Sequence, residues 1–157
     1  MSVAFRRESD EEHLEPKFEI PIPPGPNLVT TRGLALIRGR VAEIDGQLKK
    51  LSDENAIKAA KRDLRYWQTR EITAEIVPVP SGAVVQIGTV VTFLHSGKRR
   101  SLSIVGDDEA EPAIGLVSFS APLSRVLMTA APGDFLDFGG TEDAIEVLQI
   151  AVIGEHA

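Results

Sequence analysis

The sequence predicts an α+β fold, in which an antiparallel hairpin of two helices precedes a small antiparallel β-sheet domain with one short helix. In residues 30–77 the apolar side chains recur at alternating spacings of three and four, which is the pattern of two helices packed along a seam. After the linker Pro78-Val79-Pro80-Ser81-Gly82 the apolar period changes to two, which is typical of strands with one buried face. Two periods separated by a breaker predict two structural units, an arm and a body.

The first helix of the predicted arm has good N-cap residues at Thr30 and Thr31 and should run to about Leu51, a length of roughly 30 Å. The chain should turn at residues 52–55, where Ser52 or Asp53 can cap the second helix. Asp53 and Glu54 suit the positive end of that helix, so the tip is expected to be acidic and exposed. The seam residues are Leu34, Ile37, Val41, Ile44, Leu48 and Leu51 in the first helix and Ile57, Ala60, Leu64 and Trp67 in the second.

The flanking regions give weaker patterns. Residues 1–29 contain the run Ile20-Pro21-Ile22-Pro23-Pro24-Gly25-Pro26, where successive prolines exclude helix and favour an extended, flexible tail that could pack down near residues 26–29. In the body, residues 78–157, a helix is predicted over 122–130 and a hairpin turn over 95–98. The predicted strands cover residues 83–87, 89–94, 99–105, 116–120, 135–138 and 143–153.

The net charge of -6 is divided unevenly along the chain. Residues 30–77 contain ten Lys and Arg against seven Asp and Glu, whereas residues 78–157 contain four against ten. A basic arm favours nucleic acid or an acidic channel as its surroundings. Along one side of the second helix lie Lys58, Lys61, Arg62 and Arg65, followed by Arg70, and the first four are candidates for phosphate contact. The alternative is an ordinary solvated helix face.

Several classes of site are excluded or disfavoured by composition. The absence of cysteine excludes disulfides and thiolate metal sites, and the three histidines have neither triad nor metal-ligand spacing. No apolar run approaches about 18 residues, and the charged start lacks a signal core, so a cytoplasmic protein is expected. The acidic run at 107–111 lacks the alternating spacing of a calcium loop, so neither a bound metal nor a cofactor is predicted.

Two runs in the body and two in the arm carry a family resemblance. The body runs are Ile104-Val105-Gly106-Asp107-Asp108-Glu109-Ala110 and Ser118-Phe119-Ser120-Ala121-Pro122-Leu123-Ser124-Arg125-Val126-Leu127. The arm contributes Thr30-Thr31-Arg32-Gly33 at its start, and Glu54-Asn55-Ala56 with Ala59-Ala60-Lys61 at its tip and second helix. Together they resemble the Gre family of bacterial transcript cleavage factors.

The resemblance implies an FKBP-like C-terminal domain that docks on bacterial RNA polymerase at the mouth of its secondary channel, with the coiled coil pointing toward the catalytic magnesium. It also makes nascent RNA a candidate contact, and we expect a monomer. The residues that it assigns to docking are Ser120, Ala121, Pro122 and Leu123 with the neighbouring acidic residues Asp107, Asp108 and Glu109.

The sequence departs from the family pattern mainly in the arm. Each arm helix lacks about three turns, so the tip would stop roughly 15 to 20 Å short. Glu54 matches the second acidic position of the family tip, but Leu51 stands at the first, and Asp53 could replace it only if the turn is rearranged. Ala121 stands where the family has serine. In arm length the chain is closer to short-armed relatives such as the regulator of nucleoside diphosphate kinase.

Two functions therefore remain open, and neither makes the chain an enzyme in itself. As a cleavage stimulator it would use Asp53 and Glu54 to help hold a second magnesium ion in the polymerase active site. As a regulator, which we favour, it would occupy the channel mouth without chemistry. A prolyl isomerase is disfavoured because that pocket needs an aromatic lining and the body has only Phe93, Phe119, Phe135 and Phe138.

Overall fold

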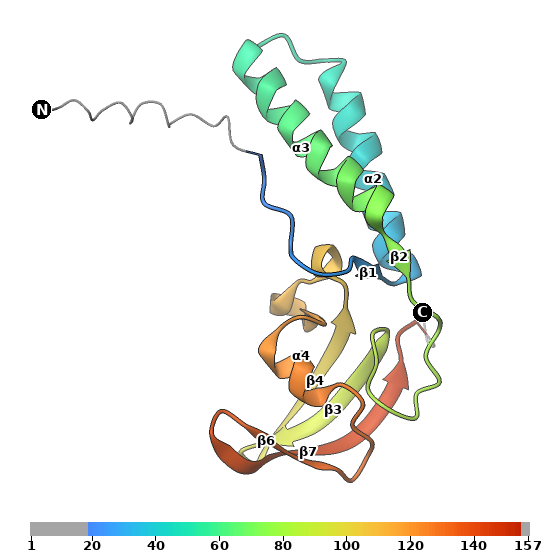
Figure 1. Cartoon of the computed structure of the whole chain (residues 1–157), viewed down its shortest axis with the longest axis vertical. Coiled ribbons are helices and arrows are strands. Elements are labelled where there is room, and N and C mark those ends of the chain that lie inside the picture. Colours follow the sequence, from blue (N-terminus) through green and yellow to red (C-terminus); the bar gives the residue numbers. More distant parts are fainter. Residues whose placement is uncertain (1–18, 155–157) are drawn as a thin grey trace, which may run out of the picture.

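The arm is a pair of helices, α2 (Thr31–Leu48) and α3 (Glu54–Thr73), which lie side by side and run in opposite directions (Figure 1). The computed structural model describes residues 19–154. At 1.5 Å per residue the two helices are about 27 and 30 Å long. The seam predicted from the sequence is the buried side of this pair: Leu34, Ile37 and Ile44 are buried, while Val41, Leu48, Ile57, Ala60, Leu64 and Trp67 are half-buried.

The turn at the tip comes earlier than predicted. α2 ends at Leu48 and not near Leu51, and the loop is 49–53 and not 52–55. Lys50 N–H donates to the Gln47 carbonyl at 2.9 Å, an i to i−3 bond that tightens the chain and ends the helix. Asp53 then caps α3, because its carboxylate accepts from Ala56 N–H at 2.9 Å.

The chain enters and leaves the arm through two short parallel strands, β1 (Leu28–Val29) and β2 (Glu75–Ile76). Val29 is buried with Leu34 and Ile37 of α2, and Trp67 of α3 packs against this cluster. Residues 27–29, at the end of the predicted tail, belong to the fold, while residues 1–18 lie outside the described residues.

The body contains a five-stranded sheet in the order β5-β4-β3-β7-β6. The strands are β3 (Thr89–His95), β4 (Lys98–Val105), β5 (Leu116–Ser118), β6 (Phe135–Phe138) and β7 (Thr141–Val152). All neighbours are antiparallel except β4 and β5, so the prediction of a purely antiparallel sheet is wrong at this edge. The chain crosses between those two strands through the short turns η1 (Asp107–Glu109) and η2 (Pro112–Ile114), which bring β5 back in the direction of β4.

The core of the body lies between this sheet and the short helix α4 (Pro122–Leu127). Val91, Phe93, Ile104, Leu127, Ile145 and Val147 are fully buried there. Residues 83–87 were predicted as a strand, but they form a loop whose Val85 exchanges backbone hydrogen bonds with Thr129 and Ala130 behind α4. α4 itself ends before the predicted residue 130 because the backbone leaves the helical region at Met128, whose ψ is 136°, and Thr129 follows in a left-handed conformation with φ 68°.

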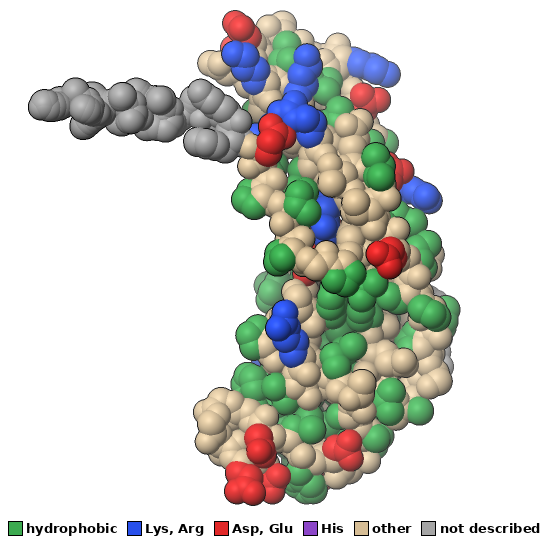
Figure 2. Space-filling view, in the orientation of Figure 1, with side chains coloured by type: hydrophobic (Ala, Val, Ile, Leu, Met, Phe, Trp, Pro, Cys, Tyr) green, Lys and Arg blue, Asp and Glu red, His purple; other side chains and the backbone are tan. Residues whose placement is uncertain are grey.

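The surface reflects the charge division seen in the sequence. Figure 2 shows Lys and Arg side chains gathered over the arm, whereas the far end of the body, over β6 and β7, shows acidic side chains. None of the helices in residues 19–154 is long and apolar enough to cross a lipid bilayer.

Candidate functional site

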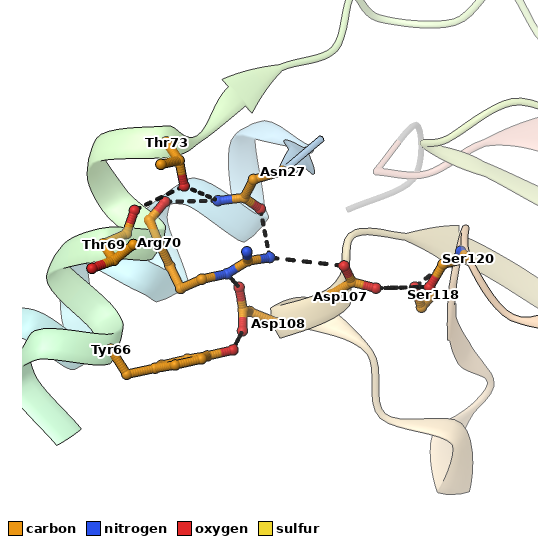
Figure 3. Close-up of polar contacts among 9 residues, drawn as sticks. All are labelled: Asn27, Tyr66, Thr69, Arg70, Thr73, Asp107, Asp108, Ser118 and Ser120. Carbon is orange, nitrogen blue, oxygen red and sulfur yellow. Dashed lines mark hydrogen bonds and ion pairs between the residues drawn. The ribbon is translucent and has the colours of Figure 1, made fainter. Parts of the chain in front are cut away.

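The most densely bonded polar cluster lies where the loop after β4 meets the base of the arm (Figure 3). Asp108 accepts a hydrogen bond from Arg70 Nε at 2.6 Å and another from the Tyr66 hydroxyl at 2.5 Å. Arg70 is 1% exposed and the Asp108 side chain 7% exposed. A buried ion pair therefore joins the arm to the body. We call Asn27, Thr30, Tyr66, Arg70, Asp107, Asp108 and Glu109 the joint.

A second nitrogen of the Arg70 guanidinium is also engaged. Its Nη2 donates to Asn27 Oδ1 at 2.8 Å and lies 3.8 Å from a carboxylate oxygen of Asp107. The Asn27 amide donates in return to the Arg70 carbonyl at 2.8 Å and to the Thr73 hydroxyl at 3.2 Å. Burying a guanidinium is costly unless its donors find acceptors; here the Asp108 carboxylate and the Asn27 amide oxygen accept hydrogen bonds, and the Asp107 carboxylate adds a nearby negative charge.

Glu109 holds the first turn of α2. Its side chain is 2% exposed and accepts from the Thr30 hydroxyl at 2.6 Å and from Arg32 Nη1 at 2.8 Å. Thr30 is the N-cap of α2, and its oxygen accepts from Gly33 N–H at 2.9 Å. A Cβ on Gly33 would lie 2.9 Å from Glu109 Oε1, so any larger residue would have to push the carboxylate from its place beside Thr30. Three residues of the run Thr30-Thr31-Arg32-Gly33 thus accommodate Glu109: Thr30 and Arg32 donate hydrogen bonds to its carboxylate, and Gly33 leaves space beside it.

Asp107 extends the network to the predicted docking residues. Its Oδ1 accepts from the Ser118 hydroxyl at 2.5 Å and from the Ser120 hydroxyl at 2.9 Å. We call Ser120, Ala121, Pro122 and Leu123 the docking segment. Asp107 therefore links this segment to Arg70 and the arm, as Figure 3 shows.

The structure separates the predicted docking residues into two groups. Ser120 and Pro122 are exposed, while Ala121 and Leu123 are half-buried and Leu123 packs against the core. Asp108 and Glu109 face the arm, and Asp107 is only 15% exposed. The carboxylates of this acidic loop pair with arm residues inside the joint, and its assignment to the docking surface stays a prediction.

The two predicted tip carboxylates also differ. Asp53 caps α3, whereas Glu54 is 85% exposed and lies 3.9 Å from Lys58 Nζ. Within the described part of the chain, no group of three or more His, Asp or Glu side chains could hold a metal ion.

The predicted phosphate-contacting residues differ in how accessible their side chains are and in whether they are already paired. Lys58 and Lys61 are exposed and Arg62 is half-buried. Arg65 forms two hydrogen bonds of 2.8 Å with Glu19, which lower the pKa of Glu19 and raise that of Arg65. Arg70, which the sequence placed on the same basic side, is buried in the joint.

Sequence reasoning missed Asn27, Tyr66 and Arg70 as site residues. A weak signal existed, because Tyr66 and Arg70 are four residues apart and share a face of α3 next to the seam residue Trp67. Burial, and then the hydrogen bond to Asp108, raise the pKa of Tyr66 above its ordinary value.

Comparison with known proteins identifies the family. Residues 80–152 match the family profile described as the C-terminal domain of transcription elongation factor GreA/GreB. Transcription elongation factor GreA of Helicobacter acinonychis is 30% identical over 125 residues, which cover 70% of this chain and 76% of that protein. The chain belongs to the GreA/GreB family. The resemblance seen in the sequence motifs is thereby confirmed.

The chain is also similar to further proteins. GreA of Rhizobium etli is 28% identical over 120 residues, covering 70% of this chain and 76% of that protein. The crystal structure of GreA factor homolog 1 (Gfh1) of Thermus thermophilus is 22% identical with a TM-score of 0.37, covering 81% of this chain and 99% of that one. A GreA/GreB structure from Nitrosomonas europaea is 18% identical with a TM-score of 0.39, covering 82% and 99%.

Proposed function

We propose that this GreA/GreB family member is a regulator that binds bacterial RNA polymerase at the rim of the secondary channel, inserts its short arm and does not stimulate efficient transcript cleavage. The observation that carries the proposal is the engagement of Asp53, whose carboxylate caps α3 at 2.9 Å from Ala56 N. A carboxylate that caps the start of a helix leaves that position only at a cost of about 1 kcal/mol. Of the two tip acids, only Glu54, which lies 3.9 Å from Lys58 Nζ, is then free of a capping role.

The chemistry of a second magnesium ion supports this choice. Magnesium binds hard oxygen ligands at about 2.1 Å in near-octahedral geometry, so a useful tip must bring its carboxylates very close to the metal. Helices of about 27 and 30 Å are short for such a reach. Lys49 and Lys50 stand on the tip loop and add positive charge where an incoming cation would be held.

The alternative function is that of a cleavage factor whose acidic tip helps to hold the second magnesium ion. It is favoured by one observation, the 85% exposure of Glu54 at the end of the arm. Glu54 is free to turn toward a metal if the channel of the partner brings one close enough.

Docking is proposed to use the segment Ser120–Leu123 of an FKBP-like body. The support is that Pro122 is exposed at the first position of α4 and that Ser120 lies beside it, bonded to Asp107. In this role the chain is a monomeric accessory factor of the bacterial cytoplasm, needs no cofactor of its own and resembles short-armed relatives in its arm.

The experiment measures binding to RNA polymerase. Pro122→Asp keeps the helix, because an acidic residue is favourable in a first turn, and it places a charge in the proposed interface. We expect at least about tenfold weaker binding, equivalent to about 1.4 kcal/mol. Val79→Asp, at an 82% exposed site in the linker, is the control and should bind as the unmodified protein does. Equal affinities for the two variants would refute docking through this segment.

The same complexes decide between the two functions. Stalled, backtracked elongation complexes are mixed with the unmodified protein and with an Asp53→Asn, Glu54→Gln variant, in which the substituted amide side chain still caps α3. We expect the RNA to keep its length in both cases while the protein competes with a full-length Gre factor. Shortened RNA that disappears with the double variant would establish the cleavage function instead.

A further inference from the structure

The segment that precedes β1 runs beside α3 (Figure 1), and we call residues 19–27 the strap. Its inner end is fixed, because Asn27 is 4% exposed and bonded to Arg70 and Thr73. Prolines at 21, 23, 24 and 26 favour an extended path and prevent the strap from coiling into a helix of its own.

The outer end of the strap is held by one ion pair. Glu19 Oε1 and Oε2 lie 2.8 Å from Arg65 Nε and Nη2 respectively, so the pair is bidentate. The Arg65 side chain is 55% exposed and that of Glu19 58% exposed. A guanidinium binds phosphate oxygens with the same fork geometry, so Glu19 occupies the position that a phosphate would take on Arg65.

Between its two ends the strap is not packed tightly onto α3. An open groove lies there, lined by Ile20 and Ile22 of the strap and by Thr69 and Ile72 of α3. Ile72 is 82% exposed, so little apolar surface is buried between the two. Exposed ion pairs contribute little to stability, and the outer end can therefore detach without disturbing the joint.

We infer that the strap is a built-in competitor for the basic side of α3, and that single-stranded RNA binds Lys58, Lys61 and Arg65 only when it displaces Glu19. The inference rests on the proposed function, which brings this side of the arm near nascent RNA. Lys58 and Lys61 are exposed on the same helix, seven and four residues before Arg65. Those spacings put the three cations along about 10 Å of one helix side, where a phosphate backbone could follow them.

The test uses the full chain and a short fluorescein-labelled oligouridylate, with binding followed by anisotropy across a salt series. Glu19→Gln removes the competing charge and should tighten binding about three- to fivefold, because a larger fraction of Arg65 becomes available. It should also steepen the slope of log K against log salt by about 0.7, the value for one added phosphate contact on a single strand. Glu142→Gln changes the net charge equally at an exposed site on β7 and is the matched control.

A double-variant cycle locates the effect at Arg65. In an Arg65→Gln background, Glu19→Gln should give no further gain, because the two residues act through one pair. The inference is overturned if Glu19→Gln and Glu142→Gln change the affinity for RNA equally, or if the gain in affinity persists in the Arg65→Gln background. It is also overturned if Glu19→Gln tightens the binding of oligoglutamate, an anionic chain without phosphates, as much as that of RNA, or if no variant binds RNA. None of these outcomes touches the proposed function, since polymerase binding by the Pro122→Asp series is measured separately.

Discussion

At the scale of single residues, the ion pair of Arg70 and Asp108 should dominate the stability of the joint. Arg70→Met leaves Asp108 buried with only the Tyr66 hydroxyl as a partner. Removing one member of a buried pair typically costs about 3 to 5 kcal/mol, because the other charge stays desolvated. We expect a loss of that order in the free energy of unfolding, measured by urea denaturation.

A double variant distinguishes the loss of the attraction between Arg70 and Asp108 from the cost of leaving the Asp108 carboxylate buried without a cation. Arg70→Met combined with Asp108→Leu removes both charges and should recover most of the loss, since apolar replacements of buried pairs are often neutral. A double variant no more stable than Arg70→Met would mean that the stranded carboxylate is not the source of the cost.

Tyr66 gives the joint a pH dependence that can be observed alone, because it is the single tyrosine of the chain. Burial and the bond to Asp108 raise its pKa in the folded state above the unfolded value of about 10. The stabilisation is therefore fully present below pH of about 10 and is lost as the pH rises toward the folded pKa. Ultraviolet titration should show tyrosinate only at higher pH than in the denatured chain. Tyr66→Phe should remove the corresponding fall in stability, and a normal titration in the folded protein would contradict the contact.

At the scale of elements, the seam residues of the arm should not be equivalent. Ile37 is 1% exposed at the base, where α2 meets Val29, whereas Leu64 is half-buried. Ile37→Ala should lower the free energy of unfolding by about 2 to 4 kcal/mol, and Leu64→Ala by less. Both changes remove three carbon atoms, but at Leu64 part of the side chain is already exposed to solvent. Thermal melts of the two variants test the order. An equal shift in both would show that the arm is packed uniformly along its length.

The same seam shows what a sequence can predict. Periodicity located both arm helices, because each helix buries one apolar side against the other, and Thr30 was among the caps expected. It failed at residues 83–87, where Val85 and Ile87 are buried in a loop and alternate as a strand would. Apolar alternation reports burial, and it cannot say whether the backbone bonds go to a ladder or to the turn behind α4.

At the scale of the whole molecule, the joint could not be predicted from local patterns. Its bonds connect residues that are 38, 42, 43 and 79 positions apart. The acidic run at 107–111 was recognised only as unlike a calcium loop, because nothing in the local sequence indicates that Arg70 and Thr30 bond to it. The predicted docking segment was partly accessible, yet its connection to the arm through Ser120 and Asp107 depends on the same long-range packing.

The joint should also fix the direction in which the arm points, and Gly106 is the place to test this. A Cβ at Gly106 would lie 2.5 Å from the Leu28 carbonyl oxygen, which is backbone and cannot turn away. The φ of Gly106 is -78°, so alanine is not strained there and the only conflict is the collision. Gly106→Ala must therefore push η1 away from β1, at a cost of about 1 to 3 kcal/mol.

This displacement should tilt the arm relative to the body while leaving the docking segment intact. Because the chain contains no cysteine, spin labels can be placed at Lys49→Cys on the tip loop and Glu142→Cys on β7, and their separation followed by pulsed electron resonance. Gly106→Ala should shift or broaden that distance. Gly39→Ala, whose Cβ meets nothing within 4 Å, should leave the distance unchanged and stabilise α2 by up to about 1 kcal/mol. If Gly106→Ala keeps both the distance and the stability of the unmodified protein, the loop absorbs the methyl group and the direction of the arm is set elsewhere.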